Sequence, residues 1–201
     1  MKKSLKRLVI DSASKFLYVA LYDDLECLGK YYAEGNNDHS VKLMSEIERI
    51  FINNNQKVED LSEIIVGIGP GSYTGLRIGV VVAKMFAWNN NIPLRVVSSL
   101  AMFASSYELN GLVLAEIDAR RGNSFLGLYR KDGKTLVLED EEKLVNLEGY
   151  KEGINETFGI VSKGEPDLEV ILHSDISVLV QDIHGLNPNY LRITEAERNL
   201  K

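Results

Sequence analysis

One glycine-rich stretch constrains this chain more than any other feature, because it fixes where a strand turns into a helix. The stretch reads Gly67-Ile68-Gly69-Pro70-Gly71-Ser72-Tyr73-Thr74-Gly75-Leu76-Arg77-Ile78-Gly79. The β-branched residues 63–66 before it are typical of a buried strand, and the apolar residues 80–88 after it suit a core helix. Glycine permits positive φ and close backbone approach, while Ser72 or Thr74 can cap the first helical turn. The sequence therefore predicts strand, tight loop and helix in direct succession.

A glycine loop before a helix N-terminus can also bind an anion, because its backbone amides point at the ligand. The phosphate-binding P-loop ends in Gly-Lys-Ser/Thr, whereas a leucine and an arginine follow Gly75 here. The dinucleotide-binding pattern fails too, since a serine or a threonine stands where its third glycine belongs. The residues therefore favour a packing turn. A nucleotide or anion contact is the weaker alternative, with these candidate residues: Asp11, Gly69, Gly71 and Asp118.

Small residues recur at every fourth position of this stretch and its helix: Gly71, Gly75, Gly79, Ala83 and Ala87. A glycine inside a helix costs about 1 kcal/mol relative to alanine, so a close contact along this ridge of small residues must offset the loss. Two explanations stay open. The ridge packs on the chain's own sheet or first helix, or it accepts a helix of another subunit.

Composition and charge narrow the class of protein. The 201 residues carry a formal net charge of −6, with 45% hydrophobic and 26% charged residues, as in ordinary soluble globular proteins. A net negative charge does not favour a fold devoted to holding a nucleic acid backbone. The single Cys27 excludes an intrachain disulfide, and no apolar run approaches the roughly 18 residues of a membrane span. We therefore expect a cytoplasmic protein with no membrane partner.

The expected elements come in the same order in both halves of the chain. The first half predicts three strands, a helix, a strand and a helix, over residues 8–11, 16–22, 27–33, 41–51, 63–66 and 72–88. The first of these helices is expected to carry Val41, Met44, Ile47 and Phe51 on its apolar face. The second half predicts the same order over residues 112–118, 124–129, 134–138, 140–147, 169–172 and a last helix capped by Ser174, with Ile176, Leu179, Val180 and Ile183 on one face. Residues 149–166 carry no clear pattern and are left unassigned.

This repetition predicts a duplicated α/β fold. Tyr22 follows Asp11 by eleven positions, and Tyr129 follows Asp118 by the same number. The order matches two RNase H-like lobes of the actin/hexokinase/Hsp70 (ASKHA) superfamily, each with a mixed sheet and flanking helices. We predict an N-terminal lobe over residues 1–104 and a C-terminal lobe over residues 105–201.

Four segments resemble the TsaB (YeaZ) family, bacterial proteins of tRNA threonylcarbamoyladenosine (t6A) biosynthesis. They are the run from Gly69 to Gly79, Leu8-Val9-Ile10-Asp11-Ser12, Ile117-Asp118-Ala119-Arg120-Arg121 and Pro188-Asn189-Tyr190-Leu191-Arg192. The first is long and specific, and together they span nearly the whole chain in the family's order. The resemblance implies the same two-lobed fold.

The resemblance also implies a function, that of a non-catalytic scaffold subunit. In the family, the scaffold pairs with its catalytic paralogue TsaD, and the ATPase TsaE joins them in a ternary TsaBDE complex. The complex transfers threonylcarbamoyl to the adenosine beside the tRNA anticodon, so that tRNA is bound mainly through the complex. By this resemblance the lone chain binds no cofactor, ATP or ADP lies at the junction of the complex, and the chain forms a homodimer when TsaD is absent.

The same resemblance speaks against a metal site and places the partner interface on the N-terminal lobe. TsaD carries two metal-ligating histidines four residues apart on its first helix, whereas here His39 is followed four positions later by Leu43. The second ligand is missing, so we expect neither a metal nor a catalytic residue. We predict that the ridge of small residues and the first helix form the interface, with these residues: His39, Leu43, Gly71, Ser72, Gly75, Arg77, Gly79 and Ala83.

An enzyme remains the alternative, either an ATP-using phosphotransferase or an M22-like metallopeptidase of the same superfamily. Nucleotide-hydrolysing members have a glycine in the turn after the first strand, whereas residues 11–14 contain none. Asp11 and Asp118 could each hold a magnesium ion, although an acidic residue at a strand end is more often a turn former. The sequence leaves open whether certain arginines contact tRNA or only solvate a surface: Arg120, Arg121 and Arg192.

Overall fold

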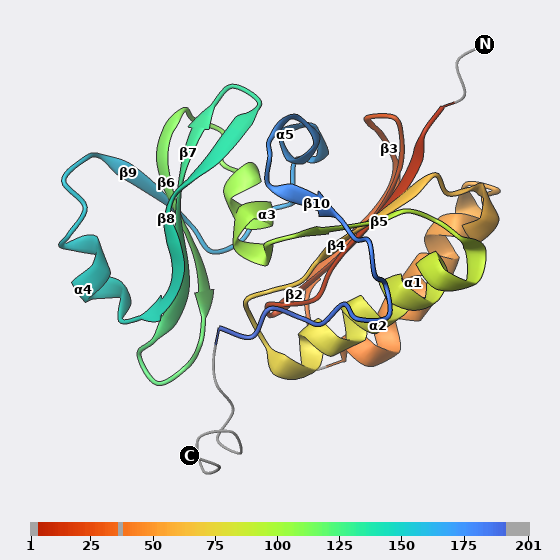
Figure 1. Ribbon diagram of the computed structural model, residues 1–201, viewed down its shortest axis with the longest axis horizontal. Coiled ribbons are helices and arrows are strands. Elements are labelled where there is room, and N and C mark those ends of the chain that lie inside the picture. The colour runs from red at the N-terminus through yellow and green to blue at the C-terminus, as the bar shows by residue number, and fades with distance from the viewer. Residues whose placement is uncertain (1–3, 36–37, 192–201) are drawn as a thin grey trace.

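The computed structural model describes residues 4–35 and 38–191, and it places the chain in two β-sheets with helices around and between them (Figure 1). Sheet A has the strand order β10-β5-β4-β1-β2-β3, and sheet B has the order β8-β7-β6-β9. The strands are β1 (Lys6–Asp11), β2 (Phe16–Asp23), β3 (Glu26–Glu34), β4 (Glu63–Gly67), β5 (Leu94–Val97), β6 (Gly111–Asp118), β7 (Ser124–Asp132), β8 (Thr135–Val145), β9 (Phe158–Val161) and β10 (Ser177–Leu179). The helices are α1 (His39–Asn53), the 3-10 turn η1 (Val58–Asp60), α2 (Tyr73–Asn90), α3 (Ser99–Ser105), α4 (Leu147–Lys151) and α5 (Leu168–His173).

Sheet A is buried on both faces, and its central strands are correspondingly apolar. β1 pairs antiparallel with β2 and parallel with β4, and β5 extends the parallel part. Successive side chains of a strand point to opposite faces, so Leu8 and Ile10 pack with residues of α1 and α2, while Val9 packs with residues of α3. The strands and helices predicted over residues 8–88 are confirmed.

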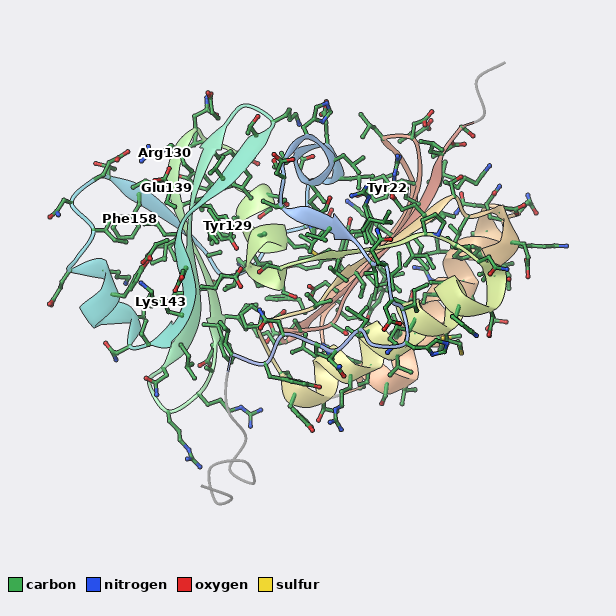
Figure 2. The ribbon with its side chains drawn as sticks, viewed as in Figure 1. Tyr22, Tyr129, Arg130, Glu139, Lys143 and Phe158 are labelled. Atoms are coloured by element: carbon green, nitrogen blue, oxygen red, sulfur yellow. The ribbon has the colours of Figure 1, made fainter. Side chains whose placement is uncertain are left out.

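Sheet B repeats the pairing of sheet A. In both sheets, a three-stranded antiparallel meander continues into a strand parallel to its first strand, so β3-β2-β1-β4 corresponds to β8-β7-β6-β9. Asp11 ends β1 and Asp118 ends β6. Tyr22 and Tyr129, on the corresponding strands β2 and β7, both belong to the buried cluster between the sheets (Figure 2). The predicted duplicated, two-lobed fold is confirmed.

Two elements of the C-terminal half differ from the prediction in type or position. Residues 140–145 extend β8, and the helix α4 begins only at Leu147. Residues 168–173 form the helix α5 rather than a strand, because the Asp167 carboxylate accepts hydrogen bonds from the first amides of that helix. A short apolar run does not distinguish a strand from a buried helix by its periodicity.

The chain after α5 also differs from the prediction. The segment after Ser174 was expected to form a helix, but it contributes β10, which pairs antiparallel with β5 at the edge of sheet A. Residues 149–166, which carry no clear sequence pattern, contain β9 at the edge of sheet B. The second repeat therefore ends in the sheet of the first.

A continuous apolar core joins the two sheets. It contains α3 and α5, with Leu100 and Val170 fully buried, and it contacts sheet A through Val9 and sheet B through Val113. The lobe boundary between residues 104 and 105 stays a prediction. α3 spans this position and is buried along its whole length, so the two sheets share one core.

The half-buried carboxylate of Glu142 adds a polar link between the sheets. The Ser98 hydroxyl, which caps α3 after β5, donates to Glu142 Oε1 on β8, and the Tyr129 hydroxyl donates to the same oxygen at 2.5 Å. Burial raises the pKa of Glu142, although these two hydrogen bonds act in the opposite direction. Burial and the neighbouring Glu142 charge also raise the pKa of Tyr129 well above its usual value.

We predict that Glu142→Gln flattens the pH dependence of stability. A carboxyl whose pKa is raised in the folded state contributes stability below its unfolded pKa and loses that contribution as the pH rises through the folded value. Glutamine keeps the acceptor oxygen but carries no charge. Urea unfolding at pH 5 and pH 8 should therefore show a smaller loss of stability at pH 8 for Glu142→Gln than for wild type. The exposed neighbour Glu141→Gln is the control, and equal losses in all three proteins would contradict this account.

Candidate functional site

The glycine-rich stretch forms the predicted strand, loop and helix. β4 ends at Gly67, and Ser72 is the N-cap of α2, where its hydroxyl accepts a hydrogen bond from the Gly75 amide at 3.3 Å. At the other end of α2, Asn91 closes the helix in a left-handed conformation with φ of 52°. The loop and both ends of the helix therefore follow from local sequence.

The ridge of small residues packs against the turn between β1 and β2. A Cβ atom on Gly75 would lie 2.1 Å from the Ser12 carbonyl oxygen, and one on Gly71 would lie 2.2 Å from the Ala13 carbonyl oxygen. The Ser12 hydroxyl donates to the Gly75 carbonyl at 2.7 Å and accepts from the Gly79 amide at 3.1 Å. Of the two explanations left open by the sequence, contact with the chain's own sheet is therefore the observed one.

The small residues of α2 were predicted to form an interface because they would leave a smooth surface for another helix, and this packing shows that the chain itself covers that surface. We expected a ridge free to receive another helix, but Gly75, Gly79 and Ala83 are buried within the chain, and so is Leu43 of α1. His39 is buried as well. Its Nε2 lies 3.1 Å from the Ser14 carbonyl oxygen.

Two members of the predicted interface set, Ser72 and Arg77, are exposed on α2 and its cap. The assignment of the whole set to a partner interface stays a prediction. Its members fall into a buried group that supports α2 and an exposed group that another protein could touch.

The candidate anion loop is filled by the chain itself. The Gly69 amide donates to the Ser99 hydroxyl at 3.1 Å, and the Ser72 amide donates to the Ala13 carbonyl at 2.6 Å. The Asn189 amide donates to the Ile68 carbonyl at 2.7 Å, and the Asn189 carbonyl oxygen would lie 2.8 Å from a Cβ on Gly69. Backbone from two other parts of the chain therefore occupies the space around Gly69 and Gly71.

The two candidate aspartates have different environments. Asp11 is buried beside Gly67 and Ser99, and its Oδ1 accepts from the Ala13 amide at 2.9 Å. Burial raises the pKa of Asp11, and its polar neighbours lower it by less. Asp118 is exposed, and its Oδ1 accepts from the Arg120 amide at 2.7 Å, which is the contact of a turn former.

Neither aspartate belongs to a metal cluster. Across residues 4–35 and 38–191, no group of three or more histidine, cysteine, aspartate or glutamate side chains is placed to hold a metal ion.

Arg120 and Arg121 form the tip of the β6–β7 hairpin. Arg120 is exposed and has a φ of 65°, and Arg121 is exposed with a φ of 57°. Arg192 lies outside the described residues. Whether any of the three contacts tRNA stays open.

The outer faces of α1 and α2 expose a set of large apolar side chains. These are Val41, Met44 and Ile52 on α1 and Val81, Met85 and Trp88 on α2. The exposed fraction is 75% for Val41, 61% for Val81 and 55% for Trp88. We call these six residues the outer apolar face; the two helices lie side by side on one face of sheet A (Figure 1). Exposed apolar patches of this kind mark interaction sites.

The sequence interpretation missed the outer apolar face. It placed Val41 and Met44 on the buried face of α1 together with Ile47 and Phe51, but only the latter two are buried. The signal was present in the spacing of residues 41, 44 and 52, which lie on a second stripe of the helix at 3.6 residues per turn. An amphipathic helix needs one apolar stripe, so a second one indicates a further contact.

Fold and site together define a class: a duplicated RNase H-like protein of the ASKHA superfamily whose glycine loop is filled by its own chain. Solved structures agree with the fold. They include "YeaZ from Pseudomonas aeruginosa", with a TM-score of 0.71 and 23% identity over 84% of this chain and 89% of that one. A second, described by its similarity to the peptidase YeaZ, has a TM-score of 0.77 and 21% identity over 94% of this chain and 100% of that one.

Sequence comparison identifies the family. The chain is 30% identical to the tRNA threonylcarbamoyladenosine biosynthesis protein TsaB of Bacillus subtilis, over 94% of this chain and 95% of that protein. It is also 30% identical to the protein of the same name from Escherichia coli, over 69% and 61% of the two chains. The family model described as "TsaD: tRNA N6-adenosine threonylcarbamoyltransferase" matches residues 33–170. The chain belongs to the TsaB (YeaZ) family. Within residues 4–35 and 38–191, each helix is too short or too polar to span a lipid bilayer.

We predict that Gly75→Ala destabilises the fold, because its new methyl group would meet the Ser12 backbone at 2.1 Å. The expected loss is about 2 kcal/mol, typical of overpacking against a fixed backbone. Gly149→Ala in α4 is the matched control, since its Cβ would meet nothing closer than 3.7 Å. It should be neutral or stabilising by about 0.5 kcal/mol. Urea denaturation measures both, and a Gly75→Ala protein as stable as wild type would contradict the close approach.

Proposed function

We propose that this chain is a non-catalytic scaffold subunit in the biosynthesis of t6A, and that it binds the catalytic subunit TsaD through the outer apolar face. In this proposal the pair transfers threonylcarbamoyl to the adenosine beside the tRNA anticodon, with TsaE and ATP completing the complex. The tRNA is held mainly by the complex, ATP or ADP lies at its junction, and the chain pairs with itself when TsaD is absent. The observation that carries the proposal is the outer apolar face.

The interior of the N-terminal lobe supports a scaffold rather than an enzyme. The amides of the glycine loop that could receive a phosphate at Gly69 and Ser72 are bonded within the chain. Asp11, at the position from which a nucleotide-hydrolysing relative would hold a metal, is buried and has a raised pKa.

The match to the TsaD family model favours TsaD as the partner that covers the outer apolar face. The TsaD family model matches residues 33–170, a range that contains both α1 and α2. A TsaD subunit is therefore expected to carry an equivalent pair of helices. Two such pairs can bury their apolar side chains against each other across a pseudo-twofold axis, and two copies of this chain can do the same across a true one.

We predict that Val81→Asp and Met85→Asp each weaken pairing with the cognate TsaD by roughly thirtyfold or more. Burying an unpaired carboxylate in an interface costs about 2 kcal/mol or more, which is roughly thirtyfold in affinity. Val81 and Met85 are exposed in the free chain, so thermal unfolding should stay near wild type.

The matched control is Val137→Asp, another exposed valine, which lies on β8. Co-purification and isothermal titration calorimetry measure the pairing. Wild-type affinity in both α2 variants would remove the outer apolar face from the interface. ATP or peptide hydrolysis by the isolated chain would contradict the scaffold role.

A further inference from the structure

The chain after β10 lies as a strap along α2. The strap comprises residues 180–190 and can be followed in Figure 1 as the blue segment that leaves β10 and runs along the helix. Its backbone is fixed at both ends, where the Val180 amide donates to the Leu94 carbonyl at 2.8 Å and the Asn189 amide donates to the Ile68 carbonyl at 2.7 Å. The strap is therefore bonded at one end to β5 of sheet A and at the other end to the glycine loop that follows β4.

The strap holds the N-terminal end of α2 through an aromatic and cationic stack. The Arg77 guanidinium lies 4.1 Å from the centre of the Tyr73 ring, and Arg77 Nε donates to the Tyr190 hydroxyl at 3.1 Å. The Tyr190 and Tyr73 rings have centroids 4.9 Å apart. Three side chains that would otherwise be free on the surface are thus fixed relative to one another.

The strap holds the other end of α2 as well. Lys84 Nζ donates to the carbonyl oxygens of His184 at 2.9 Å and Leu186 at 2.8 Å. The His184 ring stands edge-on to the Trp88 ring, with 3.7 Å between their centroids. Trp88, a member of the outer apolar face, is therefore positioned by the strap.

These contacts lie directly beside the outer apolar face. At 3.6 residues per turn, positions 73, 77, 84 and 88 fall within about 60° on the surface of α2, and positions 81 and 85 lie next to them, about 20–60° further round. Tyr73 remains 44% exposed and Trp88 55% exposed despite the strap. The strap thus fixes two large aromatic side chains and leaves part of each open to a partner.

We infer that the strap is a positioning element of the partner surface, with Tyr190 as its main positioning residue for TsaD. Tyrosine, tryptophan and arginine dominate the energetics of protein interfaces, and a side chain already held in its bound arrangement loses less entropy on association. The strap holds Tyr73, Arg77 and Trp88 before the partner arrives. This inference rests on the proposed function, since it names further residues of the same docking site.

The test compares three tyrosine variants in their affinity for cognate TsaD, measured by calorimetry, and in their thermal unfolding. Tyr190→Leu removes both the ring stack and the acceptor for Arg77, and we expect pairing to weaken about tenfold. Tyr190→Phe keeps the ring and should weaken pairing only about twofold to threefold. Tyr150→Leu is the control, because Tyr150 is another partly buried tyrosine with a bonded hydroxyl, donating to Asp140 at 2.7 Å, and it lies on α4 beside sheet B.

The outcomes separate this inference from the proposal on which it rests. Wild-type affinity in Tyr190→Leu, together with lost pairing in Val81→Asp, would overturn the strap and leave the outer apolar face standing. Wild-type affinity in both would overturn both. If Tyr190→Leu lost pairing only in proportion to a loss of folded protein, without recovery in Tyr190→Phe, the strap would be a structural element alone and the inference would be wrong.

Discussion

The structure depends on the close approach of α2 to the turn between β1 and β2. Glycine at positions 71 and 75 removes the Cβ atoms that would otherwise meet the backbone of Ala13 and Ser12, and glycine at position 79 leaves room for the Ser12 hydroxyl. That hydroxyl bonds two groups of the helix backbone. Helix glycines are unfavourable by about 1 kcal/mol each, and this contact offsets them. The glycine-rich stretch, which resembles an anion-binding loop in sequence, thus allows close packing of α2 on the β1–β2 turn.

Several properties of the surface follow from this close contact between α2 and the turn from β1 to β2. With its small side pressed on sheet A, α2 turns Val81, Met85 and Trp88 outward beside α1. The loop before α2 contacts the backbone of Ala13 on one side and that of Asn189 on the other, so backbone surrounds Gly69 and Gly71. In the proposed function, this packing of α2 also turns outward the apolar side chains that would meet TsaD.

The sequence could predict the N-terminal lobe well because its signals are local. Continuous apolar runs define β1 and β2, Ser72 caps α2, and Asn91 ends it. The C-terminal lobe was harder, because short apolar runs such as residues 168–173 and 177–179 take their structure from a capping carboxylate or a neighbouring strand. The pairing of β10 with sheet A depends on a partner strand about 80 residues earlier, and no local pattern encodes that.

The candidate site was likewise predictable only where its signals are local. The sequence could locate the ridge of small residues, but it could not say which of two backbones the ridge meets, since both need the same smooth surface. It read Val41 and Met44 as core, because periodicity alone does not tell which of two apolar stripes faces inward. The contact between Arg77 and Tyr190 joins residues 113 positions apart, and only the folded chain reveals it.

The central claim is that the outer apolar face of α1 and α2, bordered by the strap, is where this chain meets its catalytic partner. Amide hydrogen exchange of the chain with and without cognate TsaD tests it most directly. The account predicts that binding slows amide exchange in α1 (His39–Asn53), in α2 (Tyr73–Asn90) and in the strap, and leaves exchange in sheet B unchanged. Protection confined to β6–β9, with none in α1 or α2, would contradict it.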